Sequence, residues 1–61
     1  MEIGKKLKDA RMKSGFTQEN VAEKINVSRQ TISNWENEKS YPDIISVIAL
    51  SDLYSTSLMI Y

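Results

Sequence analysis

The 61-residue sequence contains no cysteine and no histidine, and it has only two glycines and one proline. Without cysteine the chain cannot form a disulfide framework, an iron–sulfur site or the usual thiolate zinc site. Without histidine it also lacks the commonest general base and the commonest metal ligand. Two glycines are too few for a loop that cradles phosphate groups. This inventory argues against an enzyme, a metal site and a bound cofactor.

Long hydrophobic runs are absent as well. No apolar stretch approaches the roughly 20 residues of a membrane-spanning helix, and the N-terminus lacks the hydrophobic segment of a signal peptide. We therefore expect a cytoplasmic protein with no membrane partner. The length predicts one small domain over residues 1–61 and leaves open a missing C-terminal extension. Eight basic and eight acidic residues make the chain neutral, although the basic ones are concentrated near the N-terminus.

The sequence predicts an all-α fold of four to five short helices, because apolar residues recur every three or four positions and never alternate. The first helix is expected over residues 2–14, with Gly15 as its stop. Thr17 and Ser28 are natural N-caps for the second and third helices, each preceded by an apolar residue that can pack onto the first turn. A last turn is expected over residues 58–61.

The fourth helix is expected to begin at Pro42 and Asp43, since proline is favoured in the first turn and an acidic residue suits a helix N-terminus. The apolar spacing marks its inner face. That face is predicted to consist of Ile44, Val47, Leu50, Ser51 and Tyr54.

Residues 18–36 have the spacing of two helices that meet at a wide angle through a short turn. Ala22 is small enough to let the two helices approach each other closely. Asn26 suits the turn, because asparagine tolerates the left-handed backbone conformation better than most residues. Ile32 and Trp35 are expected to fill the space between the helices. The pattern predicts a helix-turn-helix.

The segment TQENVAEKINVSRQTISNWENEKSYP resembles the helix-turn-helix of the Cro/CI-type (phage-repressor-like, Xre) family of transcriptional regulators. IGKKLKDARMKSGFTQ before it and PDIISVIALSDLYSTSL after it extend the resemblance over nearly the whole chain. Asn26 stands where the family usually has glycine. The resemblance implies a lambda-repressor-like domain that binds operator DNA, usually as a dimer, with its third helix in the major groove.

The outward face of the third helix is predicted to read bases. At 100° per residue, an inward Ile32 and Trp35 leave four residues pointing away from the core, with Arg29 on the flank: Gln30, Ser33, Asn34 and Asn37. Arginine can bond guanine, and glutamine or asparagine can bond adenine. The resemblance places Arg29, Gln30 and Asn34 on the family's principal base-reading positions, with Ser33 as a weaker candidate. The alternative interpretation is a polar face that is simply solvated.

A second set of polar residues is predicted to contact the DNA backbone. By resemblance, Gln18 lies where family members place a glutamine against a phosphate. Thr17 is more readily explained as a helix cap, and Thr31 serves packing equally well. The full set of backbone candidates comprises Thr17, Gln18, Thr31, Asn37 and Lys39.

Two further groups of residues are assigned to structure and to assembly. The resemblance implies a partly buried ion pair between Arg11 and Glu36. The fourth helix carries more apolar residues than one inner face needs, which favours an interface with a second copy or with a missing domain. The predicted interface residues are Ile45, Ala49, Met59, Ile60 and Tyr61.

The sequence therefore predicts a sequence-specific regulator of transcription that binds double-stranded operator DNA, most readily a repressor acting as a dimer on a palindrome. One alternative is an antitoxin or adaptor of the same fold that acts mainly through a protein partner. An enzyme is disfavoured, because no nucleophile–base pair can be assembled without histidine or cysteine.

Overall fold

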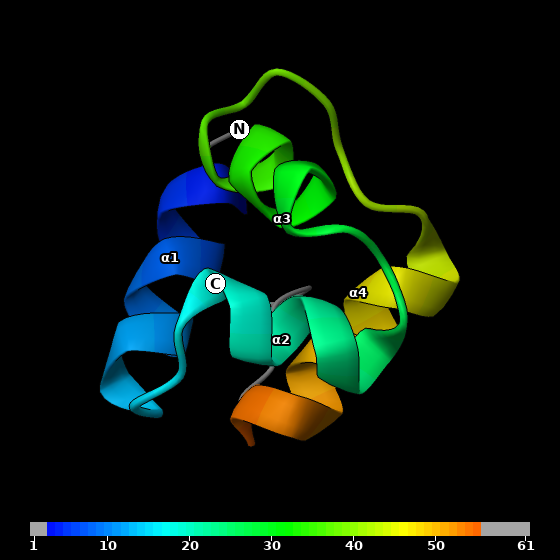
Figure 1. The fold of residues 1–61 in the computed structure, drawn as a ribbon. Coiled ribbons are helices and arrows are strands. Elements are labelled where there is room, and N and C mark those ends of the chain that lie inside the picture. The colour runs from blue at the N-terminus through cyan, green and yellow to red at the C-terminus, as the bar shows by residue number, and fades with distance from the viewer. Residues whose placement is uncertain (1–2, 56–61) are drawn as a thin grey trace.

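The computed structural model describes residues 3–55, in which all regular secondary structure is helical, and this confirms the predicted all-α class (Figure 1). The first predicted helix ends at Lys13, one residue earlier than expected, and its expected first residue, residue 2, lies outside the described residues. The last turn predicted over residues 58–61 lies outside the described residues. The helices are α1 (Ile3–Lys13), α2 (Gln18–Ile25), α3 (Arg29–Glu36) and α4 (Ile44–Tyr54).

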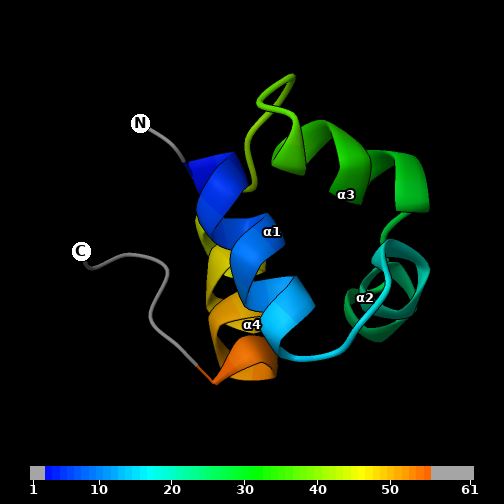
Figure 2. The same cartoon turned by 90° about the vertical axis from the view of Figure 1, so that its left-hand side faces the viewer.

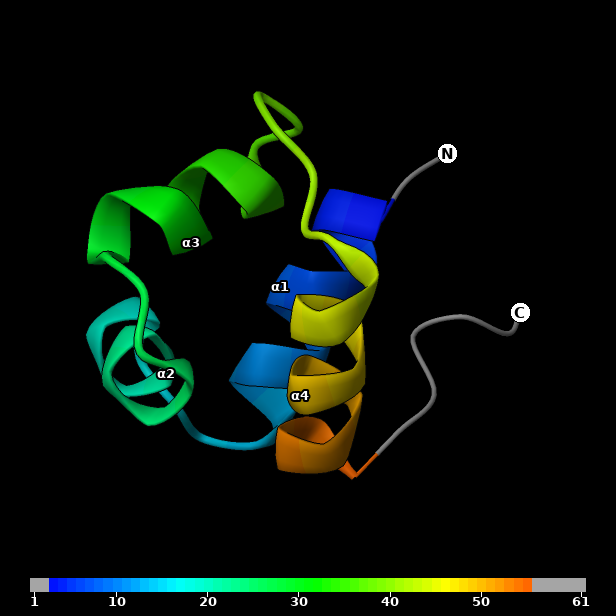
Figure 3. The same cartoon turned by 90° about the vertical axis from the view of Figure 1, so that its right-hand side faces the viewer.

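The four helices surround one apolar core. In the view of Figure 1, α1 lies on the left and α4 begins on the right, with α3 above α2 in the middle of the picture. In the side views of Figures 2 and 3, α2 and α3 lie together at one edge, and no other described helix covers the outer side of α3. All four helices contribute to the buried core, which consists of Leu7, Val21, Ala22, Ile32, Trp35, Val47, Leu50 and Tyr54.

Short-range signals define both ends of α2. The Thr17 hydroxyl accepts a hydrogen bond from the backbone N–H of Asn20 at 3.0 Å. The Asn20 side chain in turn accepts from the backbone N–H of Thr17 at 3.1 Å, which completes a capping box. At the other end Asn26 adopts the left-handed conformation, with φ 62° and ψ 47°. The tight turn into α3 follows from this residue, as the sequence predicts.

The start of α4 differs from the prediction. Asp43 is the N-cap, so the helix begins at Ile44 and Pro42 precedes it. The Asp43 carboxylate accepts hydrogen bonds from the Ser46 hydroxyl at 2.7 Å and from the Ser46 backbone N–H at 3.3 Å. The bond from the Ser46 side chain lowers the pKa of Asp43 below its ordinary value.

Ile44 is the one clear error in the predicted inner face of α4. Val47, Leu50 and Tyr54 are buried and Ser51 is half-buried, whereas 58% of Ile44 is exposed. The helix carries isoleucine, valine, alanine or leucine on every side, so apolar spacing alone does not select one face. Burial of Val47, Leu50 and Tyr54 leaves Ile44 on the flank.

The N-terminal turn of α1 lies against the C-terminal end of α3. A Cβ atom on Gly4 would come within 2.7 Å of the Glu36 carbonyl oxygen and 2.8 Å of the Trp35 carbonyl oxygen. The Gly4 backbone N–H donates to the Glu38 carboxylate at 2.9 Å, so a residue 34 positions away satisfies a free donor of this helix end. Glu38 itself has a φ of 63°. Only glycine permits so close an approach.

Residues 3–55 contain no helix that is both long enough and apolar enough to cross a bilayer.

Candidate nucleic-acid interface

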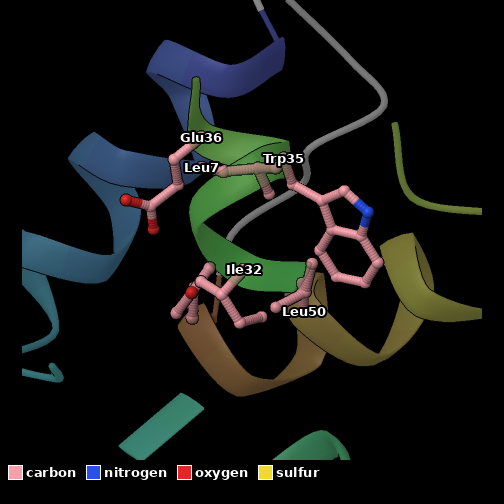
Figure 4. A pocket seen from close by; sticks show the side chains of 6 residues that line it. Leu7, Ile32, Trp35, Glu36 and Leu50 are labelled. Atoms are coloured by element: carbon pink, nitrogen blue, oxygen red, sulfur yellow. The ribbon is translucent and has the colours of Figure 1, made fainter. Parts of the chain in front are cut away.

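Three buried side chains fix the rotation of α3 about its axis. Ile32, Trp35 and Glu36 face the interior, and Ser28 caps the helix by accepting the Thr31 backbone N–H at 3.1 Å. Figure 4 shows the Glu36 carboxylate directed towards α1 and the Trp35 ring on the other side, beside α4. With this side anchored, the opposite side of α3 must face solvent.

The hollow beside these side chains is filled. It is lined by Leu7, Ile32, Trp35, Glu36, Leu50 and Tyr54, and it has no room for a water molecule (Figure 4). Residues 3–55 also hold no cluster of acidic side chains arranged for a metal ion. A group of polar side chains lies instead on the surface of α3.

The predicted base readers lie together on the outer side of α3. Arg29 and Gln30 are exposed, while Ser33 and Asn34 are half-buried. The Gln30 amide nitrogen donates to the Asn34 side-chain oxygen at 3.0 Å. One turn further, the Asn37 amide nitrogen donates to the Ser33 hydroxyl at 3.2 Å. These groups bond only within α3 and its cap, so they form one continuous polar face.

A buried ion pair ties α3 to α1. Arg11 Nε donates to Glu36 Oε2 at 2.7 Å and Arg11 Nη2 donates to Glu36 Oε1 at 3.1 Å, a bidentate arrangement. The third nitrogen, Nη1, donates to the Phe16 carbonyl oxygen at 2.9 Å. The hydrogen bond with Glu36 raises the pKa of Arg11 above its ordinary value. The pair expected from the sequence thus also holds the loop before α2.

Gln18 belongs to the same network, which the sequence did not indicate. Its Nε2 donates to Glu36 Oε1 at 3.0 Å, from the first residue of α2 to the last residue of α3. Glu36 therefore accepts bonds from α1 and α2 at once. One N–H and the carbonyl oxygen of the Gln18 amide are left for other partners. The predicted phosphate anchor is held in place by the buried ion pair.

The other backbone candidates surround the polar face of α3. Asn37 is the C-cap of α3 and Lys39 follows it, both exposed. Thr31 is half-buried, with its hydroxyl 2.7 Å from that of Ser28. The Thr17 hydroxyl is engaged in capping α2, which agrees with the interpretation of Thr17 as a cap.

The structure defines a larger apolar surface on α4 than the sequence indicated. Ile45 is 71% exposed, Ile48 52% and Tyr41, in the preceding loop, 63%. Ile44 is also exposed, and Ile44, Ile45 and Ile48 lie three or four residues apart or adjacent on α4; with Tyr41 in the loop before the helix they make up what we call the exposed α4 face. Ala49, predicted here, is half-buried. Met59, Ile60 and Tyr61 lie outside the described residues.

Two short helices joined by a left-handed turn, the second with a polar outer side, define the helix-turn-helix class of DNA-binding proteins. Comparison with protein families agrees, since the family described as "Helix-turn-helix" matches residues 7–60. The chain belongs to this family, the Cro/CI (Xre) type of helix-turn-helix transcriptional regulators.

Two curated relatives carry the same domain. The chain is 44% identical over 57 residues to the HTH-type transcriptional regulator ImmR of Bacillus subtilis (strain 168), covering 93% of this chain and 45% of the relative. It is 40% identical over 58 residues to the HTH-type transcriptional activator BcrR of Enterococcus faecalis, covering 95% of this chain and 28% of that relative. The chain thus spans less than half the length of either relative.

Proposed function

We propose that this chain is the sequence-specific DNA-binding part of a cytoplasmic regulator, and that it represses transcription by occupying a promoter. The observation that carries the proposal is the outer side of α3, where Arg29, Gln30, Ser33 and Asn34 form a polar face uncovered by any described helix. A duplex major groove is wide enough to admit an α-helix and presents donors and acceptors to such a face. The role is binding rather than catalysis.

In this proposal the two ends of α3 have different partners on the DNA. Arg29 and Gln30, in the first turn, contact base edges, where arginine suits guanine and glutamine suits adenine. Gln18, held by Glu36 at 3.0 Å, donates its remaining N–H to a phosphate. Asn37 and Lys39 beyond the C-terminal end of α3, with Thr31 on its flank, provide further backbone contacts.

A chain with no net charge gains little from general attraction to phosphate, so each subunit alone should bind weakly. We propose that two copies pair through the exposed α4 face and place their α3 helices in successive major grooves, roughly 34 Å apart. The operator would then be palindromic.

Selection from random duplex DNA tests the proposal, followed by binding titrations of the selected duplex at several salt concentrations. We expect a recurrent motif and a linear fall of log affinity with log salt concentration. Arg29→Ala should relax the preference at one base position, by about 1–3 kcal/mol. Gln18→Ala should weaken all sequences nearly equally and leave the salt slope unchanged, because a neutral amide releases no counterion when it bonds a phosphate.

A matched control separates these effects from loss of fold. Glu23→Ala changes an exposed residue of α2 that has no predicted contact, and it should leave the base preference intact. If selection enriches no motif, sequence-specific DNA binding is wrong. If Arg29→Ala and Gln18→Ala weaken every sequence alike, the division between base reading and backbone anchoring is wrong.

The dimer is tested separately by sedimentation with and without the selected duplex. Ile45→Lys places a charge on the most exposed residue of the exposed α4 face. It should abolish pairing and reduce affinity for the palindrome while leaving affinity for a single half-site unchanged. A wild-type chain that stays monomeric at high micromolar concentration and also binds the palindrome as one copy would contradict the dimer.

A further inference from the structure

The Gln30–Asn34 hydrogen bond restricts the orientation of the Gln30 amide, which bears on the base specificity of the proposed DNA site. The Gln30 amide nitrogen lies 3.0 Å from the Asn34 side-chain oxygen, one helical turn along the exposed side of α3. Asn34 is the more firmly held of the two residues. It is half-buried, and its backbone carbonyl accepts the Lys39 N–H at 2.9 Å, where the chain turns away from the helix. The shorter, half-buried Asn34 side chain therefore has less freedom than the exposed Gln30 side chain that donates to it.

The bond leaves a defined set of free groups on Gln30. An amide has two N–H donors and one carbonyl oxygen, so Gln30 keeps one donor and its acceptor. Because its nitrogen is held towards Asn34, its oxygen is held away from Asn34. Adenine offers an amino donor at N6 and an acceptor at N7 in the major groove, which match one free oxygen and one free N–H.

Orientation matters because glutamine can otherwise recognise more than one base. Guanine presents two acceptors, N7 and O6, and an amide that is free to rotate can turn its amino group towards them. An amide held by Asn34 meets O6 of guanine with its own oxygen, which is repulsive. The same restraint lowers the entropy lost when Gln30 is fixed on the DNA. The Gln30–Asn34 hydrogen bond therefore favours adenine over guanine as the base that Gln30 contacts.

Resting on the DNA-binding function proposed above, we propose that Asn34 is a positioning residue that holds the Gln30 amide in the orientation that reads adenine. The operator position read by Gln30 is then an adenine, and the preference for it depends on both residues. This dependence distinguishes a Gln30 that is positioned by Asn34 from two residues that contact the DNA independently. If Asn34 positions Gln30, removing Asn34 must change the specificity at the base that Gln30 contacts.

The test uses the selected duplex and first locates the base pair at which Gln30→Ala loses discrimination. We expect adenine there, and we expect 7-deazaadenine, which lacks the N7 acceptor, to weaken the wild-type chain but not Gln30→Ala. Asn34→Ala should lower the adenine-over-guanine preference at this position about fivefold or more, the lower end of what a bidentate amide–adenine pair contributes. Alanine is the best helix former, so α3 is retained, which circular dichroism verifies.

A conservative variant separates positioning from loss of a direct contact. Asn34→Asp keeps an oxygen that accepts the Gln30 N–H, while its negative charge weakens binding to every sequence. It should therefore lose affinity but keep the adenine preference. Met12→Ala, at an exposed residue of α1, is the control and should change neither quantity.

The outcomes are distinct. Suppose that the wild-type chain selects a motif. If Asn34→Ala then retains the adenine preference, or the base that Gln30 contacts is not adenine, the proposed positioning of Gln30 by Asn34 is wrong and the DNA-binding function stands. If no duplex is selected, the DNA-binding function itself fails. Loss of the preference in Asn34→Ala together with its retention in Asn34→Asp supports the proposal.

Discussion

The helices α3 and α4 present opposite kinds of surface to solvent. The outer side of α3 carries Arg29 and several amide side chains, of which Gln30 bonds Asn34 and Asn37 bonds Ser33. The outer side of α4 carries isoleucines that are more than half exposed. An amide and guanidinium face matches the base edges of a duplex, whereas an apolar face matches another protein surface. One small domain thus offers two surfaces suited to two different partners.

The inner sides of the two helices differ as well. The inner side of α4 is apolar, with Val47, Leu50 and Tyr54 in the core. The inner side of α3 ends in a charge, Glu36, which accepts bonds from Arg11 and Gln18. Charged bonds have stricter geometry than apolar contacts, so they fix the direction of α3 more closely than packing alone. The helix proposed to enter the groove is the one held by directional bonds.

The largest expected effect comes from breaking this charged anchor. Glu36→Ala leaves the Arg11 guanidinium buried without its partner, and the free energy of unfolding should fall by about 3–5 kcal/mol. Urea unfolding followed by circular dichroism measures the loss. Replacing both residues, as Arg11→Leu with Glu36→Leu, should restore much of it, because no buried charge remains. If Glu36→Ala unfolds like the wild type, the anchor does not hold α3.

Truncation on the two sides of α4 sharpens the comparison within that helix. Leu50→Ala removes a fully buried side chain and should cost about 2–5 kcal/mol of unfolding free energy. Ile45→Ala, on the exposed α4 face, should change the free energy of unfolding of the monomer by less than about 0.5 kcal/mol. Thermal unfolding at low protein concentration measures both. Equal losses would show that the face we describe as exposed is packed.

The next largest effect on the free energy of unfolding is expected from the contact between α1 and the end of α3. Gly4→Ala places a Cβ within 3 Å of two backbone carbonyl oxygens, so the helices must separate. We expect a loss of about 1–3 kcal/mol in the free energy of unfolding. Lys5→Ala, an exposed neighbour in the same turn, is the control and should be close to neutral. A neutral Gly4→Ala would mean that the approach is looser than 2.7 Å.

The last expected effect is confined to alkaline solution and is the pH dependence contributed by Tyr54. Burial, with the nearby Glu36 charge, raises the pKa of Tyr54 to about 12. Its value in the unfolded chain is about 10. A raised pKa stabilises the fold fully below about pH 10, and this stabilisation is lost as the pH rises through about 12.

Comparison of the wild type with Tyr54→Phe isolates this contribution, because all other titrating groups are shared. The free energy of unfolding of the wild type should fall relative to that of Tyr54→Phe between pH 10 and pH 12. Parallel curves over this range would show that the Tyr54 hydroxyl ionises alike in the folded and unfolded chains.

Local signals in the sequence predict most of the fold, and long-range bonds account for what they miss. The caps Thr17 and Ser28 and the left-handed Asn26 act within a few residues, and the sequence places them correctly. The Gly4–Glu38 bond spans 34 positions, and nothing local to either residue indicates it. Likewise, nothing local to Gln18 indicates that it joins the Arg11–Glu36 pair, although the structure brings the three side chains together.

In the candidate site, too, some features follow from local sequence and others do not. Helical spacing suffices to place Arg29, Gln30, Ser33 and Asn34 on one side of α3, because Ile32 and Trp35 give this helix a clear inner side. The same reasoning misplaces Ile44, because α4 has apolar residues all round. The bonds among the outer side chains of α3 depend on individual rotamers, which helical spacing does not determine.

The comparison of α3 with α4 is tested most directly by mapping the selected duplex onto the chain with amide chemical shifts. The 15N-labelled protein is titrated with the duplex at a concentration where its oligomeric state is constant. Our account predicts that the largest shift changes fall on residues 17–18 and 28–39, with little change at residues 44–48. Changes concentrated on residues 44–48, with the amides of α3 unmoved, would contradict it.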